Sequence, residues 1–439
     1  MELLISIKRK LVYFKASLLL ILILQYKCLG FLSGNNDKNN ILDETTTTKF
    51  GFMKTRHFLI LIILLISCRQ KDKALIDFDP RSLTENEILL TDIADDIYYI
   101  PLDNSYPIGQ IYDRIRFINN SIYFSAENIG VLDFNKEGKF LRKVGSMGRG
   151  PGEYTFVGRV AIDDKTETVY ILDNGNIIKV FSQSGKFIRS FNLKEYGDMI
   201  NAIEIYNSKL FATFSIQYEN ADYEWIAFDT LGNLIDKKNR YSTKFNSNAL
   251  PLAGIYKYEN LLTYWNNYSD TIFSILPDLN SKPSFIVSLG DHRLPKSKIT
   301  VENMSDYMWL QDIFESKQFI IIRYFFPLKK YVLVLLDKRN NKSFLINLKL
   351  NDSGTEWIGG IINDIDGGPR FLPKNYFIED GREFLVGLTN PYQIKTIVPN
   401  NEFKNSATKY PEKKQELEKL ANSLKETDNP VLMMVRLKK

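Results

Sequence analysis

Residues 130–141 read Gly-Val-Leu-Asp-Phe-Asn-Lys-Glu-Gly-Lys-Phe-Leu, and this stretch decides the fold. Two short runs rich in β-branched and aromatic residues flank a polar segment, which is typical of two strands joined by a tight turn. Gly138 lies where such a hairpin needs a positive φ angle, and glycine adopts this conformation without a steric penalty. The stretch therefore predicts a β-hairpin.

The same plan returns further along the chain. Residues 178–188 and 225–235 repeat it, and residues 333–345 are a looser copy. Gly185 and Gly232 take the turn position in the two close copies. A hairpin that recurs at intervals of roughly 40 to 50 residues fits the four-stranded blades of a β-propeller, and we count about six units. Radial packing of such blades protects the strand edges and buries a core at each blade interface.

The two ends of the repeat region carry the signs of ring closure. Residues 429–437 form an apolar strand, which would invite aggregation if its edges were exposed. We expect it to pair with a strand near residues 97–101, within one blade. Residues 411–426 have leucines on one helical face and predict a helix that leads into that strand. The prediction is an all-β, six-bladed β-propeller over residues 91–439, with a short C-terminal helix before the closing strand.

A secretory signal precedes this region. Residues 53–57 supply a basic head, residues 58–66 are an unbroken apolar run, and Ser67 stands before Cys68. These parts define a signal peptide over residues 53–67, because the apolar run is shorter than the ~20 residues that span a bilayer. Residues 65–68, Leu-Ile-Ser-Cys, resemble the lipobox of bacterial lipoproteins, which implies that Cys68 is lipidated and anchors the protein. The alternative is a buried apolar strand with an incidental cysteine.

The segments on either side of the signal are less informative. Residues 1–52 contain a second signal-like run at residues 16–24. Either translation starts at Met53, which makes the first 52 residues an over-extended N-terminus, or they add an extra hydrophobic segment. Residues 68–90 predict a polar tether, and its first residues carry no acidic cluster. That composition gives no reason to place the domain on the outer cell surface.

Charge and residue counts exclude several classes of function. The chain holds 57 Lys and Arg against 52 Asp and Glu, but residues 1–67 hold nine basic and four acidic residues. The remainder therefore has 48 of each kind, and no electrostatic argument favours nucleic acid as a partner. Cys28 and Cys68 are the only cysteines, which excludes a disulfide within the mature domain. His57 and His292 are the only histidines, too few for most zinc sites.

Residues 148–154, Gly-Arg-Gly-Pro-Gly-Glu-Tyr, are the most distinctive string in the sequence. Coming directly after the first hairpin, the string resembles the six-bladed β-propeller lipoproteins of Gram-negative bacteria, which are similar to NHL-repeat propellers. Residues 97–102, 269–273, 356–360 and 429–432 agree with this resemblance. It implies a lipid-anchored propeller in the cell envelope of a Gram-negative bacterium. The tether favours an orientation that faces the periplasm, and the resemblance implies no particular activity.

The glycine string also holds the first candidate ligand-binding residues. Its backbone N–H groups and the Arg149 guanidinium could hold a carboxylate or phosphate, with Glu153 and Tyr154 beside them. The string lacks the Gly-Lys-Ser/Thr of a P-loop. The alternative is an inter-blade connection in which the glycines permit a turn and Arg149 pairs with Glu153.

Two further sites have weaker signals. Tyr264 and Trp265 lie in Tyr-Trp-Asn-Asn-Tyr and offer surfaces suited to a sugar or peptide, unless they only pack a blade. Asp364 and Asp366 place carboxylates at alternating positions before a glycine, as Ca²⁺ loops do. The rest of an EF-hand is missing, so a polar turn is the simpler interpretation. No cofactor is firmly predicted, and Ca²⁺ is the one candidate.

Two functions remain open at this stage. The first is a monomeric, membrane-anchored binding or scaffold protein whose ligand is a glycan, a peptide or an envelope protein. The second is a Ca²⁺-dependent hydrolase or lactonase of the six-bladed type, in which the ion polarises a carbonyl and a carboxylate moves the proton. The lack of a recognisable catalytic constellation favours the first function.

Overall fold

The computed structural model describes residues 76–83, 86–111, 114–197, 199–214, 222–240, 253–295, 300, 302–303, 306–326, 330–350 and 357–439. The chain divides into two compact units, residues 1–74 and 75–439, and every described residue belongs to the second. The predicted leader, signal peptide and lipidated Cys68 therefore lie outside the described residues. None of the described helices is long and apolar enough to cross a membrane.

The described strands form six sheets of four or five strands, numbered here along the chain. Sheet 1 holds β3 (Arg116–Ile118), β4 (Ser121–Ala126), β5 (Gly130–Asn135) and β6 (Phe140–Val144). Sheet 2 holds β7 (Arg159–Ile162), β8 (Val169–Asp173), β9 (Ile177–Phe181) and β10 (Phe187–Asn192). Sheet 3 holds β11 (Ile200–Tyr206), β12 (Lys209–Phe214), β13 (Tyr223–Phe228) and β14 (Leu234–Asn239).

Sheets 4 and 6 each include a strand from an earlier part of the chain, whereas the five strands of sheet 5 follow one another in sequence. Sheet 4 holds β15 (Ala253–Tyr258), β16 (Leu261–Asn266), β17 (Thr271–Ile275), β18 (Ser281–Val287) and β1 (Ile76–Phe78). Sheet 5 holds β19 (Trp309–Glu315), β20 (Phe319–Phe326), β21 (Lys330–Asp337), β22 (Ser343–Leu350) and β23 (Trp357–Ile358). Sheet 6 holds β24 (Asn375–Glu379), β25 (Arg382–Thr389), β26 (Val431–Leu437) and β2 (Ala94–Pro101).

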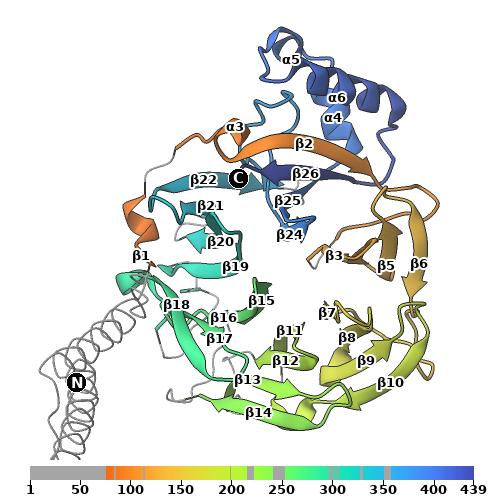
Figure 1. Ribbon diagram of the computed structural model, residues 1–439, viewed down its shortest axis with the longest axis vertical. Coiled ribbons are helices and arrows are strands. Elements are labelled where there is room, and N and C mark those ends of the chain that lie inside the picture. Colours follow the sequence, from red (N-terminus) through yellow and green to blue (C-terminus); the bar gives the residue numbers. More distant parts are fainter. Residues whose placement is uncertain are drawn as a thin grey trace, which may run out of the picture. The chain divides into compact units, whose positions relative to one another are not determined.

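The six sheets lie around a common centre, with β3, β7, β11, β15, β19 and β24 innermost (Figure 1). A cluster of buried apolar side chains fills the space between each pair of neighbouring sheets. Sheets 1 and 6 also meet at the centre, where Phe117 stacks on Phe377 with ring centroids 4.0 Å apart. Because each sheet is covered on both faces, central strands such as β4 and β8 are buried along their whole length. This explains why their central residues, 122–124 and 169–172, read as unbroken apolar runs.

The predicted hairpins are confirmed. Residues 130–141 form β5 and the start of β6, and the copies form β9–β10, β13–β14 and β21–β22. Gly138, Gly185 and Gly232 have φ angles of +81°, +80° and +95°. A Cβ atom at Gly138 would lie 2.2 Å from the backbone oxygen of Pro101, which belongs to the outermost strand of the neighbouring sheet. The turn glycine thus serves both the hairpin and the contact between sheets.

The predicted pairing between the first and last strands of the repeat region is confirmed as well. Strand β2 pairs antiparallel with β26, with Ile97 opposite Val435 and Ile100 opposite Leu432. Strand β25 pairs with the other edge of β26. The apolar C-terminal strand therefore exposes neither edge, which removes the aggregation hazard that its sequence presents.

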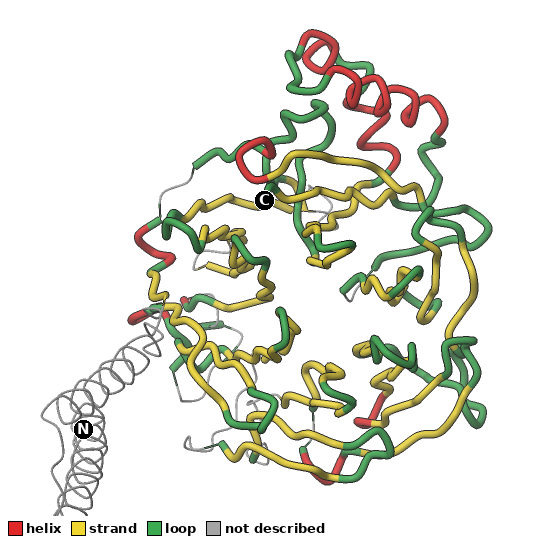
Figure 2. Tube along the Cα trace, in the orientation of Figure 1, coloured by secondary structure: helices red, strands yellow, loops and turns green. Residues whose placement is uncertain are grey.

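Helices gather beside sheet 6, between β25 and β26 in the chain (Figure 2). They are α4 (Pro391–Ile397), α5 (Asn401–Asn405) and α6 (Pro411–Ser423). Helix α6 is the predicted one, and it ends at Ser423 because Leu424 has an extended backbone. The shorter α4 and α5 are not predicted by the sequence, since seven and five residues carry little periodicity.

Short elements occur elsewhere in the described chain. Helix α3 (Leu90–Ile93) precedes β2, and the 3₁₀ turns are η1 (Pro80–Ser82), η2 (Asn174–Asn176), η3 (Lys194–Tyr196) and η4 (Gly290–His292). Strand β1 and η1 fall within residues 68–90, the expected tether. Strand β1 pairs parallel with β18, with Ile76 opposite Phe285, and Ile76 packs against the core between sheets 4 and 5. This part of the expected tether therefore extends sheet 4.

Candidate functional site

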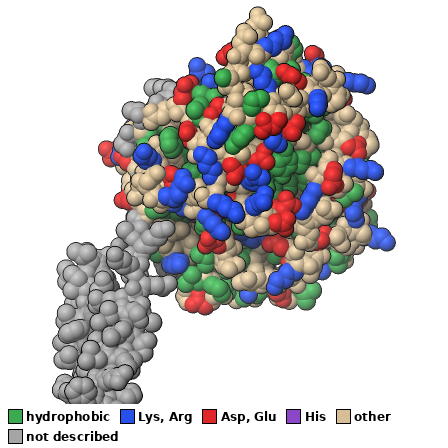
Figure 3. Space-filling model, turned by 45° about the horizontal axis from the view of Figure 1, so that its top comes forward, with side chains coloured by type: hydrophobic (Ala, Val, Ile, Leu, Met, Phe, Trp, Pro, Cys, Tyr) green, Lys and Arg blue, Asp and Glu red, His purple; other side chains and the backbone are tan. Residues whose placement is uncertain are grey.

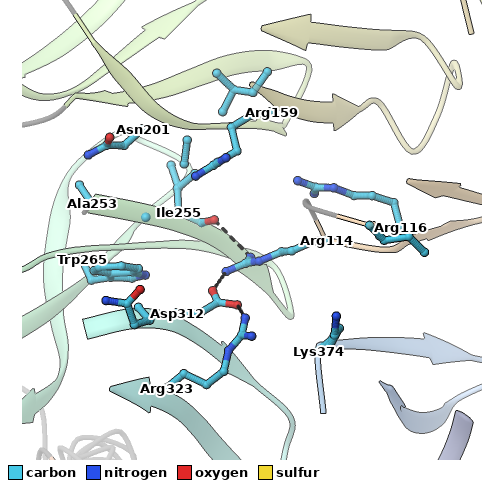
Figure 4. A pocket seen from close by; sticks show the side chains of 15 residues that line it. Arg114, Arg116, Arg159, Asn201, Ala253, Ile255, Trp265, Asp312, Arg323 and Lys374 are labelled. Carbon is cyan, nitrogen blue, oxygen red and sulfur yellow. Dashed lines mark hydrogen bonds and ion pairs between the residues drawn. The ribbon is translucent and has the colours of Figure 1, made fainter. Parts of the chain in front are cut away.

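A pocket of about 190 Å³ lies at the centre of the ring. All six sheets contribute to its lining, through Arg116 of β3, Arg159 of β7, Asn201 of β11, Gly254 of β15, Asp312 of β19 and Lys374 before β24. Most of these residues stand at or next to the start of an innermost strand. The pocket therefore lies toward the end of the ring where these strands begin, and Figure 4 shows side chains converging on it.

The pocket is strongly cationic, although the molecule as a whole is not. Five basic side chains line it, namely Arg114, Arg116, Arg159, Arg323 and Lys374, and Asp312 is the one carboxylate among the lining residues. On the face shown in Figure 3, Lys and Arg side chains are mixed with Asp and Glu. The excess of positive charge among the lining residues is therefore not shared by that face as a whole.

Asp312 organises two of these cations. Its Oδ1 accepts a hydrogen bond from Nη2 of Arg114 at 2.5 Å, and its Oδ2 accepts one from Nη2 of Arg323 at 2.6 Å. Burial alone would raise the pKa of Asp312, but the two guanidinium groups outweigh it and hold this pKa below its usual value. Arg114 also donates to the backbone oxygens of Ile255 and Ile313. The carboxylate therefore fixes both arginines in place across sheets 1, 4 and 5.

Glu204 has a similar role for a third cation. It is 2% exposed on β11, and its Oε2 accepts a hydrogen bond from Nη1 of Arg116 at 2.6 Å. Lys257 approaches its other oxygen at 3.8 Å. Burial would raise the pKa of Glu204, but Arg116 and Lys257 outweigh it and hold this pKa below its usual value. The arginine is thus held in position at the wall of the pocket.

Arg159 differs from the paired arginines. Its Nη1 donates a hydrogen bond to the backbone oxygen of its neighbour Gly158, at 2.7 Å. No described carboxylate forms an ion pair with it. Figure 4 shows its side chain extending from β7 toward the pocket.

The glycine string forms a turn away from this pocket. Arg149 is exposed, and Glu153 accepts hydrogen bonds from the backbone N–H of Gly150 at 2.7 Å and the hydroxyl of Ser146 at 3.3 Å. Tyr154 is fully buried, accepts from Val131 N–H and donates to the Val144 oxygen. These contacts are those of an inter-sheet connection, although the expected pairing of Arg149 with Glu153 is not among them. Its role as a ligand site stays a prediction.

The aromatic pair divides between two locations. Tyr264 is buried between sheets 3 and 4, where its hydroxyl contacts Lys238 and donates to Glu224 at 3.1 Å. Trp265 lies on the wall of the central pocket and is 3% exposed. Its indole lies directly over Gly254, where a Cβ atom would come within 2.5 Å of Nε1. Of the predicted site residues, Trp265 is the one that the structure places in the pocket.

The candidate Ca²⁺ loop is a turn with internal contacts. Asp364 accepts hydrogen bonds from the N–H and hydroxyl of Thr91. Asp366 is 1% exposed and accepts from Asn363 and from Gly368 N–H, and burial raises its pKa to about 6. Within the described ranges, no group of three or more His, Cys, Asp or Glu side chains could hold a metal ion. The metal assignment to these two residues stays a prediction, and so does any catalytic one. His292 is exposed in η4.

Sequence reasoning missed the basic residues of the pocket. Arg114 and Arg116 share one repeat, the other three lie in three different repeats, and none forms a local motif. One signal was available, because Arg116 and Arg159 occupy the same position, the start of the first strand, in successive repeats. Comparing that position between these two repeats would have brought Arg116 and Arg159 together, but not Arg323, which lies on the second strand of its sheet.

The fold and the central pocket are those of a β-propeller. Residues 75–436 match the family described as Domain of unknown function (DUF4934), and the chain belongs to that family. No curated protein matches the chain.

The chain also resembles solved structures of β-propellers. An exported protein from Bacteroides fragilis NCTC 9343 is 16% identical, with a TM-score of 0.56 over 83% of this chain and 99% of that one. A member of the DUF4221 family from Bacteroides vulgatus ATCC 8482 is 10% identical, with a TM-score of 0.47 over 81% and 100%. BamB from Moraxella catarrhalis is 9% identical, with a TM-score of 0.35 over 78% and 99%. At such identities the likeness concerns the fold alone.

Proposed function

We propose that this protein is a lipid-anchored, six-bladed β-propeller of the cell envelope that binds a ligand. The observation that carries the proposal is the central pocket, which is lined by residues of five sheets and by Lys374, directly before β24 of the sixth. A concave site with a few fixed polar groups and an aromatic wall is the usual form of a small-ligand site. The paired arginines are held in place by buried carboxylates, so the site is formed before a ligand arrives.

Charge argues for binding rather than Ca²⁺-dependent hydrolysis. Calcium takes six to eight oxygen ligands and favours carboxylates. The lining offers five cations and one carboxylate, and that carboxylate already accepts from Arg114 and Arg323. A divalent cation at this position would be repelled by the guanidinium groups. The pocket therefore suits an electron-rich ligand better than a metal.

The proposed location rests on the leader sequence. A basic head, a short apolar run and Cys68 after Leu-Ile-Ser are the parts of a lipoprotein signal. The Bacteroides fragilis neighbour is described as an exported protein, which agrees with this compartment. We place the propeller in the envelope, facing the periplasm.

Thermal melting of the full chain in detergent tests the binding function. We expect at least one member of a panel of glycans, peptides and small organic anions to raise the melting temperature, because a ligand that binds the folded state stabilises it by mass action. We expect no change with Ca²⁺ or EDTA. A shift with Ca²⁺, together with Ca²⁺-dependent hydrolysis of a lactone or ester, would establish the enzyme instead.

A further inference from the structure

The chemical class of the ligand follows from which pocket groups are already paired. Arg114 and Arg323 share the carboxylate of Asp312, and Arg116 is paired with Glu204. Two carboxylates thus face three guanidinium groups. Even with these pairs in place, the pocket keeps an excess of positive charge, and Arg159 adds to it.

Arg159 is the cation with the most unused hydrogen-bonding capacity. A guanidinium has five N–H donors and no acceptor. Arg159 uses one donor on the oxygen of Gly158 and forms no described ion pair. Its side chain extends into the pocket in Figure 4. Arg159 is partly exposed, and an anion in the pocket would supply acceptors for its remaining donors.

Two buried donors of other lining residues also lack acceptors. Nε1 of Trp265 and Nε of Arg323 are buried and have no hydrogen-bond partner among the described residues. Both groups can only donate. A buried donor without an acceptor costs about 1 to 3 kcal/mol, so the partner that relieves it must be rich in acceptors. Neither a metal ion nor an apolar group meets that requirement.

The geometry points to a binding site for a small organic anion that carries a carboxylate or phosphate group, contacted by Arg159, Arg323 and Trp265. This inference rests on the proposed binding function and names its ligand class. Arginine matches the paired oxygens of both groups through its planar fork. The volume of about 190 Å³ limits the ligand to a small molecule.

The positions of the pocket groups are fixed by neighbouring sheets. Gly254 on β15 faces Trp265 on β16 across a ladder pair, and its missing side chain is what lets the indole lie flat there. Arg114 is also within 5.8 Å of the ring centroid of Tyr256, a cation–π contact. Because these groups are held before binding, little entropy is lost when the anion enters.

Isothermal titration of the full chain with sodium succinate, inorganic phosphate and glucose tests the inference. Succinate probes a carboxylate ligand, phosphate a phosphate ligand, and glucose a neutral one. We expect one of the anions to bind, with an affinity that falls as ionic strength rises. Glucose should not bind.

Three variants locate the site. Arg159→Gln should raise the Kd of the anion about tenfold or more, since a charge-assisted hydrogen bond is lost. Trp265→Phe keeps an aromatic ring, removes the N–H donor and should weaken binding severalfold. Arg382→Gln, at an exposed residue of β25 outside the pocket lining, is the matched control and should leave the Kd unchanged. Each variant is first compared with the parent chain by its melting temperature without ligand.

The outcomes separate the two proposals. If glucose binds while neither anion does, the binding function stands and the anionic class is wrong. If an anion binds equally well to the Arg159→Gln chain, or loses affinity with Arg382→Gln, the assigned site is wrong. If no probe of any class binds, both the anion site and the binding function are contradicted.

Discussion

Asp312 shows how one side chain sets the geometry of the pocket. It joins Arg114 of sheet 1 and Arg323 of sheet 5, at 2.5 and 2.6 Å. Asp312→Asn keeps the size of the side chain and leaves two guanidinium groups without their counter-charge. Removing one partner of a buried pair costs several kcal/mol, and partial exposure of Arg323 reduces this, so we expect a loss of about 2 to 3 kcal/mol in the free energy of unfolding.

Chemical denaturation measures this loss, and the chain offers a control. Asp95 pairs with Arg436 at 2.6 Å, but its side chain is 42% exposed. Asp95→Asn should change the free energy of unfolding by less than about 1 kcal/mol, as surface pairs do. Equal effects of the two substitutions would show that Asp312 has no special role in holding sheets 1 and 5 together.

Cys68 carries the anchor prediction. Cells fed labelled palmitate should incorporate it into the parent chain and not into Cys68→Ala. Cys28→Ala is the matched control, because Cys28 is the one other cysteine and lacks the lipobox-like residues before it. Label retained in the Cys68→Ala protein would show that Cys68 is not the lipidated residue.

The buried carboxyl group of Asp133 should make the stability of the protein depend on pH. It is fully buried on β5, 3.1 Å from Nε of Arg142. Burial raises its pKa to about 6, against the opposing effects of Ser121 and Arg142. The folded chain therefore holds a proton that the unfolded chain releases above about pH 4. Stability attributable to this group falls as pH rises from about 4 to about 6 and is constant above.

Comparison with Asp133→Asn isolates this contribution. The difference in free energy of unfolding between the parent and the variant should shift by roughly 3 kcal/mol from pH 4 to pH 7, in favour of the variant at the higher pH. Urea titrations at pH 4, 5, 6 and 7 measure it. A difference that stays constant across this range would rule out a raised pKa.

At the scale of the elements, a turn glycine allows a hairpin to contact the neighbouring sheet closely. Gly138→Ala would place a Cβ 2.2 Å from the oxygen of Pro101 at a φ angle of +81°. Gly381→Ala, at +70°, meets nothing within 4 Å and reports backbone strain alone, about 1 kcal/mol. We expect Gly138→Ala to destabilise the protein by at least about 1 kcal/mol more than this. Equal losses in the free energy of unfolding, measured by denaturant titration, would mean that the backbone at Pro101 moves away from the new Cβ atom at little cost.

The elements that could be predicted from the sequence are those with a local cause. The hairpins follow from alternating composition and a turn glycine within a dozen residues, as in residues 130–141. The closing pair of β2 and β26 was predicted because an apolar terminal strand needs partners on its edges. Helices α4 and α5 were not predicted, since their burial depends on Ile394 and Phe403 packing beside α6. Strand β1 was missed because Ile76–Phe78 is too short to read as a strand.

At the scale of the whole molecule, the pocket is a product of the ring rather than of any motif. Arg114 and Asp312 are 198 positions apart and meet because their sheets converge at the centre. The glycine string drew attention because its composition is unusual, yet the structure uses it as a turn with Tyr154 as a buried anchor. Trp265 was a candidate for its aromatic face, and its indole N–H gives it a second role in the pocket.

Tryptophan fluorescence during an anion titration tests most directly whether the central pocket is the binding site. Trp265 lines the pocket, whereas Trp225 and Trp309 are buried outside its lining. An acceptor that reaches the indole N–H should change the emission of the parent chain in a saturable way. The same titration of Trp265→Phe should give no such change, with weakened binding still detectable by calorimetry. A saturable change of equal size in the Trp265→Phe chain would contradict a site at the centre of the ring.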